Sequence, residues 1–528
     1  MTRIFNTAGP CRPADHYMLP PERRLPGVRS LIDQKHFFVV HAPRQTGKTT
    51  TLQTLAERLT EEGRYTALHV SCEAAQAAGE NVDDGVAAIL RNIEGLARRL
   101  PEALRPEPVE ASREIEGLSR LQLYLGRWAE RSARPVVLFL DEIDSLVGNT
   151  LISVLRQLRS GYPQRPSAFP QSVVLIGLRD VRDYRLETSP AAASLGTSSP
   201  FNVKVESLTL RDFTADEVAE LLRQHTEETG QRFAPAASAR VFELTSGQPW
   251  LVNALARQLV EQLVTDRSEE ITAEHVAIVK EILIQRRDTH LDSLIDRLRE
   301  PRVRRVIEPI LAGQFPRDEI LDDDIQLAKD LGLVRSGSGG LEIANPIYRE
   351  IVPRALTAVT EEYLPIARRR YLAADGRLLF DQLLDDFIVF WREHAEAFLN
   401  RQPYSEAAAQ LIFMAFLQKI VNGGPKTGVS AIDREYAVGS GRIDLHVRWP
   451  LPDGRLERFA VELKVWRDGE VDPLEKGLKQ LGGYLDRLDL EQGTLILFDR
   501  RSDAKPLPER CSRTALTDAG REIAVLRL

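Results

Sequence analysis

The stretch HFFVVHAPRQTGKTT, residues 36–50, decides how the fold of this chain begins. An apolar β-branched run stands directly before a glycine-containing turn, and a helical pattern, TLQTLAERL, follows the turn. Phosphate groups are held by backbone N–H groups at a helix N-terminus, together with an ammonium and a Mg²⁺-binding hydroxyl. Gly47 allows the tight turn, Lys48 brings the ammonium and Thr49 brings the hydroxyl. The stretch therefore predicts a strand, a phosphate-binding loop and a helix.

The loop departs from the usual GxxxxGK[ST] pattern at one position. Ala42 stands where the first glycine is normally found, which adds one methyl group to the loop. We expect the nucleotide to be bound by the consecutive residues Ala42, Pro43, Arg44, Gln45, Thr46, Gly47, Lys48, Thr49 and Thr50.

A second element, VVLFLDEID at residues 136–144, complements the loop. Its apolar run predicts a buried strand, so Asp141 and Glu142 emerge at the carboxyl edge of the sheet. There Asp141 is expected to hold Mg²⁺ with Thr49, and Glu142 to polarise the attacking water. A strand followed by an acidic helix N-cap is common, but a GKT loop upstream makes the catalytic interpretation the stronger one.

Two weaker positions complete this candidate site. Arg179 follows the apolar run SVVLIGL and is placed to sense the γ-phosphate, while Arg182 or Arg185 would reach the nucleotide of a neighbouring subunit in a homo-oligomer. A solvated loop arginine is an equally good interpretation of each. Gly247 and Pro249, in TSGQPW, punctuate the end of one helix and the start of the next.

The first 356 residues resemble prokaryotic AAA+-like ATPases of the additional-strand class, close to the archaeal-type and signal-transducing (STAND) groups. Those proteins combine a GKT loop and an acidic strand end with an arginine after the fourth strand, a GxP turn in a helical lid and a winged helix. The matching positions here are Lys48, Thr49, Asp141, Glu142, Arg179, Gly247 and Pro249. The opening, FNTAGP and HYMLPPERR, is also similar to a bacterial family of AAA-like ATP-binding proteins. The resemblance implies ATP and Mg²⁺ as cofactors, with Arg179 and Pro249 at the nucleotide.

Residues 305–345 read as two helices, RVIEPILAG and DDDIQLAKDLGLV, followed by a hairpin, VRSGSGGLEIAN. That order is required of a winged helix-turn-helix. Winged helices bind DNA in the origin-recognition relatives and pack against nucleotide in STAND relatives. Arginines at 297, 299, 302, 304 and 305 favour DNA, and a solvated helix face explains them as well.

The C-terminal region holds a second constellation, GSGRIDL at 439–445 and FAVELKV at 459–465. Asp444 lies within an apolar strand, and Glu462 and Lys464 share one face of the next because strand side chains alternate. Burying three charges costs several kcal/mol unless a metal or chemistry uses them. Asp444 and Glu462 are candidate Mg²⁺ or Mn²⁺ ligands, and Lys464 a group that orients the attacking water.

Three further residues extend this second site. Gln480 and Tyr484 share a helix face at i, i+4, and Glu406 opens a helix upstream. An exposed E-x-K ion pair is the alternative, which apolar residues on both faces of the strand disfavour. The set resembles the PD-(D/E)XK nuclease superfamily, in RecB-type order, over residues 400 to 500. It implies Glu406, Asp444, Glu462 and Lys464 as the catalytic set, with Gln480 and Tyr484 in support. The proline that often precedes the aspartate is Ile443 here.

We therefore expect an α/β protein built around a P-loop parallel sheet, with a restriction-endonuclease-like α/β domain at the C-terminal end. The expected domains are a P-loop ATPase core at 1–210, a helical lid at 211–290, a winged helix at 291–356, a helical linker at 357–400 and a nuclease-like domain at 401–528.

The composition indicates the class of protein, its compartment and how it would bind nucleic acid. The 528 residues are 43% hydrophobic and 28% charged, as in ordinary soluble proteins. Three widely spaced cysteines and the absence of signal-like or membrane-spanning runs predict a cytoplasmic protein with no membrane partner. A net charge of −7 means that nucleic acid would be bound through a local patch, near Arg442, Lys464, Lys476 and Lys479.

Three hypotheses follow. The first is an ATPase that controls Mg²⁺-dependent cleavage of nucleic acid, with DNA favoured, a combination typical by resemblance of bacterial defence or mobile elements. The second is an ATP-driven switch whose nuclease-like domain binds nucleic acid or protein without cutting. The third is a nucleotide-dependent transcription regulator that acts through the winged helix.

Overall fold

The computed structural model describes residues 2–112, 119–178, 204–286, 289–311, 322–337, 340–363, 371–401, 408–421, 431–438, 441–518 and 520–528. Contacts between Cα atoms divide the chain into two compact units. The first unit comprises residues 1–276 and 326–333, and the second comprises residues 277–325 and 334–528.

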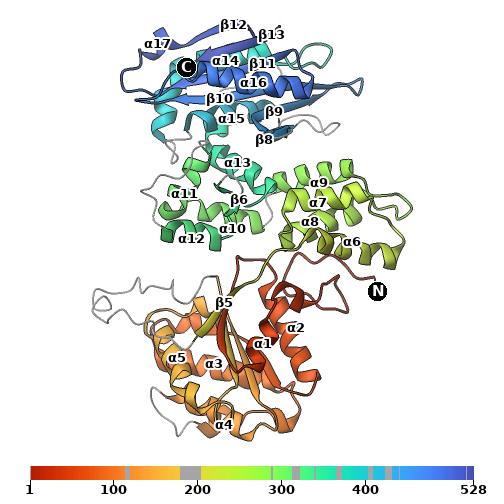
Figure 1. Cartoon of the computed structure of the whole chain (residues 1–528), viewed down its shortest axis with the longest axis vertical. Coiled ribbons are helices and arrows are strands. Elements are labelled where there is room, and N and C mark those ends of the chain that lie inside the picture. The colour runs from red at the N-terminus through yellow and green to blue at the C-terminus, as the bar shows by residue number, and fades with distance from the viewer. Residues whose placement is uncertain are drawn as a thin grey trace. The chain divides into compact units, whose positions relative to one another are not determined.

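The first unit is built on a parallel sheet of five strands (Figure 1). Their order is β2-β3-β4-β1-β5, and each neighbouring pair is parallel. The strands β1, β3 and β4 are apolar and almost wholly buried, as expected when helices cover both faces. The bounds are Phe37–His41 for β1, Thr66–Ser71 for β2, Val136–Asp141 for β3, Ser172–Gly177 for β4 and Lys204–Thr209 for β5.

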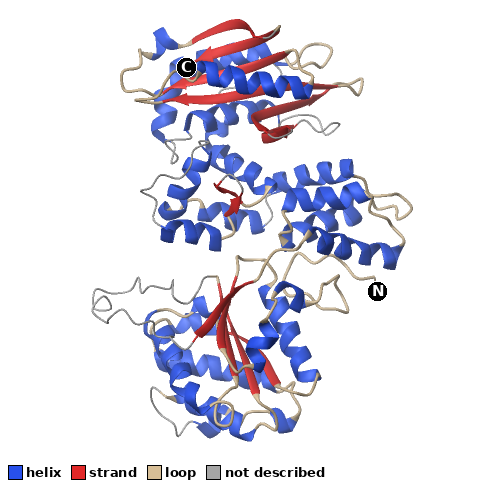
Figure 2. Cartoon of the chain, in the orientation of Figure 1, coloured by secondary structure: helices blue, strands red, loops and turns tan. Residues whose placement is uncertain are grey.

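Two apolar clusters cover the two faces of this sheet. Alternate strand residues divide between them, so Phe37 and Val39 lie in one cluster while Phe38 and Val40 lie in the other. The first cluster includes side chains from α3, α4 and α5, and the second includes side chains from α1 and α2. Figure 2 shows the helices that flank this sheet. These helices span Val28–Asp33 (α1), Lys48–Glu61 (α2), Val82–Ala97 (α3), Arg120–Arg131 (α4) and Gly148–Gly161 (α5).

Helices alone follow β5 in the first unit. They are α6 (Ala215–Thr229), α7 (Pro235–Thr245), α8 (Pro249–Gln258) with a π-helical turn at Leu259–Leu263, and the start of α9 (Ala273–Arg286). Threonine side chains cap two of these helices at their N-termini. Thr214 forms a reciprocal capping box with Glu217, and Thr272 Oγ1 accepts a hydrogen bond from His275 N at 3.4 Å.

A helical group and a short hairpin follow along the chain, and they belong to the second unit except for residues 326–333, which belong to the first. The order is α10 (Thr289–Arg297), α11 (Pro301–Leu311), α12 (Asp322–Asp330), β6 (Val334–Gly337), β7 (Gly340–Ile343) and α13 (Pro346–Tyr363). The strands β6 and β7 pair antiparallel, so the helices and hairpin expected from the sequence are present. A buried ion pair joins α9 to α13, with Lys280 Nζ 2.6 Å from Glu350 Oε1.

The C-terminal part of the second unit is a mixed sheet of six strands in the order β12-β13-β11-β10-β9-β8. The helix α16 packs on one face, and α14 and α15 pack on the other. The strands are β8 (Ala431–Val438), β9 (Gly441–Pro450), β10 (Leu456–Trp466), β11 (Gln492–Asp499), β12 (Ser512–Asp518) and β13 (Arg521–Arg527). The helices are α14 (Phe380–Arg401), α15 (Ala408–Val421), α16 (Leu474–Leu488) and α17 (Leu507–Arg510).

The fold class expected from the sequence, a parallel-sheet α/β unit with a separate α/β region, is confirmed. The strands β8, β12 and β13 were not predicted from the sequence. Within the described ranges, every helix is too short or too polar to span a lipid bilayer.

Candidate nucleotide site and candidate nuclease site

The loop between β1 and α2 is shaped by two residues with positive φ. Gln45 has φ 58° and Gly47 has φ 82°, and α2 begins directly afterwards at Lys48. Thr46 is buried, and its hydroxyl donates to Pro43 O at 2.9 Å, which closes the loop from behind. The first backbone N–H groups of α2 have no helical partner, so this turn has the geometry of an anion site.

The Lys48 ammonium lies inside the loop. Its Nζ donates to the carbonyl oxygens of Ala42 at 2.7 Å and Pro43 at 2.8 Å. Burial lowers the pKa of Lys48 to about 8, against the raising effect of Asp141 and Asp144. The ammonium is therefore held by the backbone oxygens of the loop that would surround a phosphate.

Asp141 and Glu142 stand at the carboxyl end of β3, beside the loop. Thr49 Oγ1 donates to Asp141 Oδ2 at 2.8 Å, which joins the two expected Mg²⁺ ligands. Glu142 has φ 55°, a left-handed conformation that bulky residues seldom adopt, and its N–H donates to Asp141 Oδ1 at 2.8 Å. The loop hydroxyl and both carboxylates are therefore brought together as the sequence predicted.

Two residues of β2 that sequence reasoning missed hold these carboxylates. His69 Nε2 donates to Asp141 Oδ2 at 3.0 Å, and Ser71 Oγ donates to Glu142 Oε2. Burial alone would raise the pKa of Asp141, but the hydrogen bonds from His69 and Thr49 outweigh it and lower that pKa. Because β2 pairs with β3 in register, His69 and Ser71 lie directly opposite Phe139 and Asp141.

A cavity of about 500 Å³ opens over the loop. Of the expected nucleotide contacts, Arg44, Gln45, Gly47, Lys48, Thr49, Thr50, Asp141, Glu142 and Pro249 line it. The volume falls within the range usual for small-molecule sites. The cavity is also lined by the N-terminal segment, residues 6–11 and 17–19, and by helix residues such as Leu221 of α6 and Trp250 of α8.

The N-terminal segment is hydrogen-bonded to α2, α6 and α8. Cys11 N donates to Thr50 Oγ1 at 2.9 Å, and Trp250 Nε1 donates to Thr7 O at 2.9 Å. Tyr17 OH lies 3.2 Å from His225 Nδ1 on α6. The segment therefore connects α2 to α6 and α8 beside the cavity that it lines.

Gly247 and Pro249 take the places expected of them at a helix junction. Gly247 has φ 79°, and Pro249 is the first residue of α8 and lines the cavity. A Cβ on Gly247 would lie 1.9 Å from Phe213 O, so only glycine fits. Arg179, Arg182 and Arg185 lie outside the described residues.

Comparison with known proteins agrees with this geometry: residues 31–184 match the family model of the AAA domain. This part of the chain is an AAA-type P-loop ATPase domain. No curated protein matches the chain.

Among solved structures, the Walker-type ATPase of Pyrococcus abyssi is similar at 14% identity and a TM-score of 0.48, over 66% of this chain and 99% of that one. The ORC2 protein of Aeropyrum pernix has 16% identity and a TM-score of 0.35, over 64% and 92%. The RuvB Holliday junction branch migration motor of Thermotoga maritima has 14% identity and a TM-score of 0.32, over 62% and 92%. Likenesses this distant say nothing about what the chain acts on.

In the second unit, Asp444, Glu462 and Lys464 converge on neighbouring strands. Leu445 pairs with Val461 between β9 and β10, so Asp444 and Glu462 follow at the next step. Lys464 Nζ donates to Glu462 Oε1 at 2.6 Å, and Leu463 N donates to Asp444 Oδ2 at 2.8 Å. The three side chains are therefore in contact or one step apart, and Glu462 and Lys464 share one face of β10 as the sequence predicted.

The Glu462 carboxylate is the most unusual group of this cluster. It is only 2% exposed, and within the described part of the chain its Oε2 is buried without a hydrogen-bond partner. Burial and the charge of Asp444 raise the pKa of Glu462 to about 7, although Lys464 opposes them. Burial would lower the pKa of Lys464, but Asp444 and Glu462 raise it.

The two supporting residues lie on α16, which covers this face. Tyr484 is in the apolar cluster that also contains Ala460 of β10. Gln480 lies one turn earlier on the helix, and its Oε1 is buried without a hydrogen-bond partner within the described residues. Glu406 lies outside the described residues.

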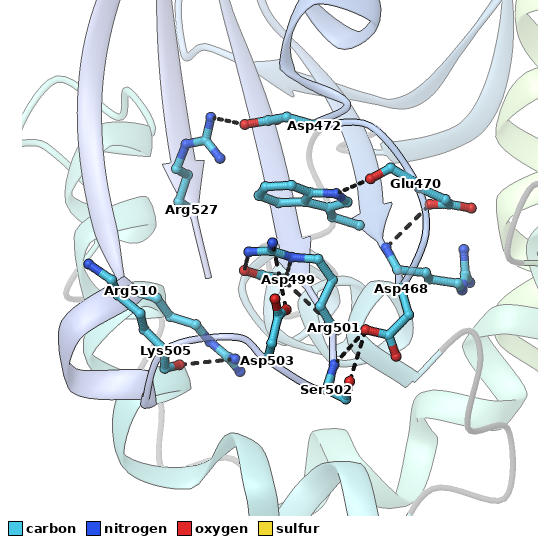
Figure 3. A network of polar contacts seen from close by, with 12 residues as sticks. Asp468, Glu470, Asp472, Asp499, Arg501, Ser502, Asp503, Lys505, Arg510 and Arg527 are labelled. Carbon is cyan, nitrogen blue, oxygen red and sulfur yellow. Dashed lines mark hydrogen bonds and ion pairs between the residues drawn. The ribbon is translucent and has the colours of Figure 1, made fainter.

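Beyond Lys464, a polar network fixes the ends of β10 and β11 (Figure 3). Arg501 donates to Asp499 from Nε at 2.9 Å and from Nη2 at 2.8 Å, and its guanidinium lies 3.5 Å from the centroid of the Trp466 ring. Trp466 Nε1 donates to Glu470 O at 3.0 Å. Within this network Arg501 pairs with Asp499 and Arg527 pairs with Asp472, so these ion pairs brace the strand ends.

Four arginines of the run around α11 are also paired with carboxylates. Arg302 and Arg305 both contact Asp324, at 2.6 and 3.0 Å, while Arg297 and Arg299 pair with acids three residues away. These ion pairs support the solvated-face interpretation of this arginine run more than the DNA-binding one.

Proposed function

We propose that the chain hydrolyses ATP at the first site and uses this reaction to control Mg²⁺-dependent cleavage of nucleic acid at the second. The observation that carries the proposal is the partly buried cluster of Asp444, Glu462 and Lys464 in a chain that also has an AAA-type ATPase domain. DNA is the favoured substrate in this proposal. The proposal also includes a homo-oligomer, because the arginines expected to reach the nucleotide of a neighbouring subunit follow β4 in the sequence.

The first site fits ATP with Mg²⁺. Lys48 would exchange its carbonyl partners for phosphate oxygens, and Thr49 and Asp141, already 2.8 Å apart, would hold the metal. Mg²⁺ would supply charge neutralisation at the phosphates. Glu142, held by Ser71, would orient the attacking water and accept its proton.

The second site fits a divalent cation on the evidence of its own charges. Within the described residues Glu462 Oε2 is buried without a hydrogen-bond partner, and Lys464 only partly offsets the repulsion between Glu462 and Asp444, which a cation between them would reduce. Asp444 and Glu462 would hold Mg²⁺ or Mn²⁺, which supplies Lewis-acid activation of the phosphodiester. Lys464 would orient the attacking water, and Gln480 and Tyr484 would support it from α16.

Metal titration of the full chain tests the second site directly. Calorimetry without nucleotide should show Mn²⁺ binding that is lost in Glu462→Ala and retained in Asp141→Ala, because the two carboxylates belong to different sites. Equal Mn²⁺ binding by wild type and Glu462→Ala would contradict the proposal. It would instead favour the ATP-driven switch whose C-terminal domain binds a partner without cutting it.

A further inference from the structure

A buried guanidinium from the segment before β1 reaches the nucleotide cavity. Arg24 ends the 3₁₀ turn Pro21–Arg24 and is 4% exposed. Its Nε donates to Arg211 O at 2.8 Å, and its guanidinium lies 4.8 Å from the centroid of the Phe213 ring. Arg24 and Phe213 line the same cavity as Lys48. The backbone and an aromatic ring therefore fix the side chain in place.

The far end of Arg24 lies beside the phosphate-binding loop. A Cβ built on Gly47 would be 3.3 Å from Arg24 Nη1. Gly47 is the N-cap of α2 and stands directly before Lys48. The guanidinium therefore ends next to the loop backbone whose N–H groups would face phosphate oxygens.

Among the described residues, Arg24 forms no ion pair with a carboxylate, although Asp212 and Glu217 act on its charge electrostatically. Its Nη2 is buried, and among the described residues it has no hydrogen-bond partner. The carboxylate of Glu217, which acts on Arg24 electrostatically, is bound instead by both terminal nitrogens of Arg211, at 2.6 and 2.7 Å. Burial lowers the pKa of Arg24 to about 10, which leaves the group charged at neutral pH.

An anion bound in the cavity would give the Arg24 guanidinium the hydrogen-bond acceptor and the negative charge that the described residues do not provide. Buried charged donors are nearly always hydrogen-bonded, because an unmet charge in a low-dielectric site is costly. A guanidinium matches phosphate oxygens in shape and charge, and it can contact two at once. Phosphate is also the ligand to which the adjoining loop is suited.

We propose that Arg24 binds a phosphate oxygen of the nucleotide, so that one chain brings two cations, Lys48 and Arg24, to the same phosphate chain. This inference rests on nucleotide binding by the first site and is independent of cleavage at the second. It assigns a ligand-binding role to the segment upstream of β1. Arg211 then acts as a positioning residue. Its carbonyl oxygen orients the Arg24 guanidinium, and its own guanidinium pairs with Glu217 and so keeps that carboxylate from binding Arg24.

The test is calorimetric titration of the full chain with Mg-ATP, Mg-ADP and adenosine. Arg24→Met keeps an unbranched side chain about as long as the arginine stem and removes the guanidinium and its charge. Loss of a charge-assisted hydrogen bond predicts roughly 10- to 100-fold weaker ATP and ADP binding, with adenosine binding unchanged. Arg24→Lys keeps the charge without the fork and is expected to lie between Met and wild type.

Arg165→Met is the matched control. Arg165 also has buried nitrogens without hydrogen-bond partners in the described structure, and it lies 3.3 Å from the centroid of the Tyr162 ring, outside the residues that line the cavity. Its removal should leave all three affinities unchanged. Thermal melting checks that each variant folds. Should Arg24→Met fail to fold, the decision rests on Arg24→Lys, which must bind ATP more weakly with adenosine unaffected.

Three results would overturn the inference. One is ATP affinity equal to wild type in a folded Arg24→Met or, where that variant does not fold, in Arg24→Lys. Another is an equal loss for adenosine and ATP, which would place Arg24 at the nucleoside. The third, a wild-type chain that binds none of the ligands, removes the nucleotide site itself and is distinguishable from a loss confined to the variants.

Discussion

Replacing Gly247 with alanine probes the junction that closes the nucleotide cavity. Gly247 has φ 79°, and an alanine Cβ would lie 1.9 Å from Phe213 O and 3.1 Å from Phe213 N. The backbones already touch, since Phe213 N donates to Gly247 O at 2.9 Å. Phe213 also packs under Arg24 and lines the cavity. The methyl group must therefore displace the chain that supports the nucleotide site.

Two costs add in this variant. Holding alanine in the left-handed region costs about 1–2 kcal/mol. Moving the Phe213 backbone away costs about 1–3 kcal/mol more, as in other overpacked sites. We expect Gly247→Ala to lose about 2–5 kcal/mol of stability. Gly230→Ala isolates the first cost, because Gly230 has φ 82° and its Cβ would meet nothing within 4 Å.

Urea denaturation followed by tryptophan fluorescence compares the two variants in the full chain. The transition that reports the first unit should shift to lower urea in both, and clearly further in Gly247→Ala. ATP binding should weaken only in Gly247→Ala. If the two variants lose the same stability, the steric reasoning at Phe213 is wrong.

Three other predictions test separate parts of the account. Lys48→Ala should reduce ATP turnover by at least about 100-fold in a steady-state phosphate-release assay, because the loop loses its ammonium. Asp444→Asn should abolish nucleic-acid cleavage while leaving ATP turnover intact, and Asp453→Asn, in the exposed β9–β10 turn, should leave both unchanged. Burial lowers the pKa of His225 below its usual 6.5, although the Gln231 hydrogen bond opposes this, so its stabilising contribution is present above pH 6.5 and is lost as the pH falls. The melting temperature of wild type should thus fall more steeply between pH 7 and pH 5 than that of His225→Gln.

The parts of the sites that the sequence predicted are those set by neighbours along the chain. The order strand, loop and helix places Gly47, Lys48 and Thr49 by local geometry alone, and strand alternation places Glu462 beside Lys464. Asp444 was also predictable, because β9 and β10 are joined by a short turn that makes them pair.

The parts that were missed depend on tertiary pairing. His69 and Ser71 reach the acidic residues only because β2 is the strand next to β3, an order that periodicity does not reveal. Arg24 looks like either of the two arginines in PPERR until the fold buries it against Phe213. The strand β12, with its mostly exposed and polar residues, lacks the apolar alternation by which strands are recognised.

Plasmid cleavage with and without ATP tests the central claim most directly. Purified chain is incubated with supercoiled and single-stranded DNA in Mg²⁺ or Mn²⁺, beside Lys48→Ala and Lys464→Ala. We predict strand breaks by wild type that depend on ATP, altered control by ATP in Lys48→Ala, and none in Lys464→Ala. Intact DNA in every lane, from wild-type protein that is folded and turns over ATP, would contradict the account.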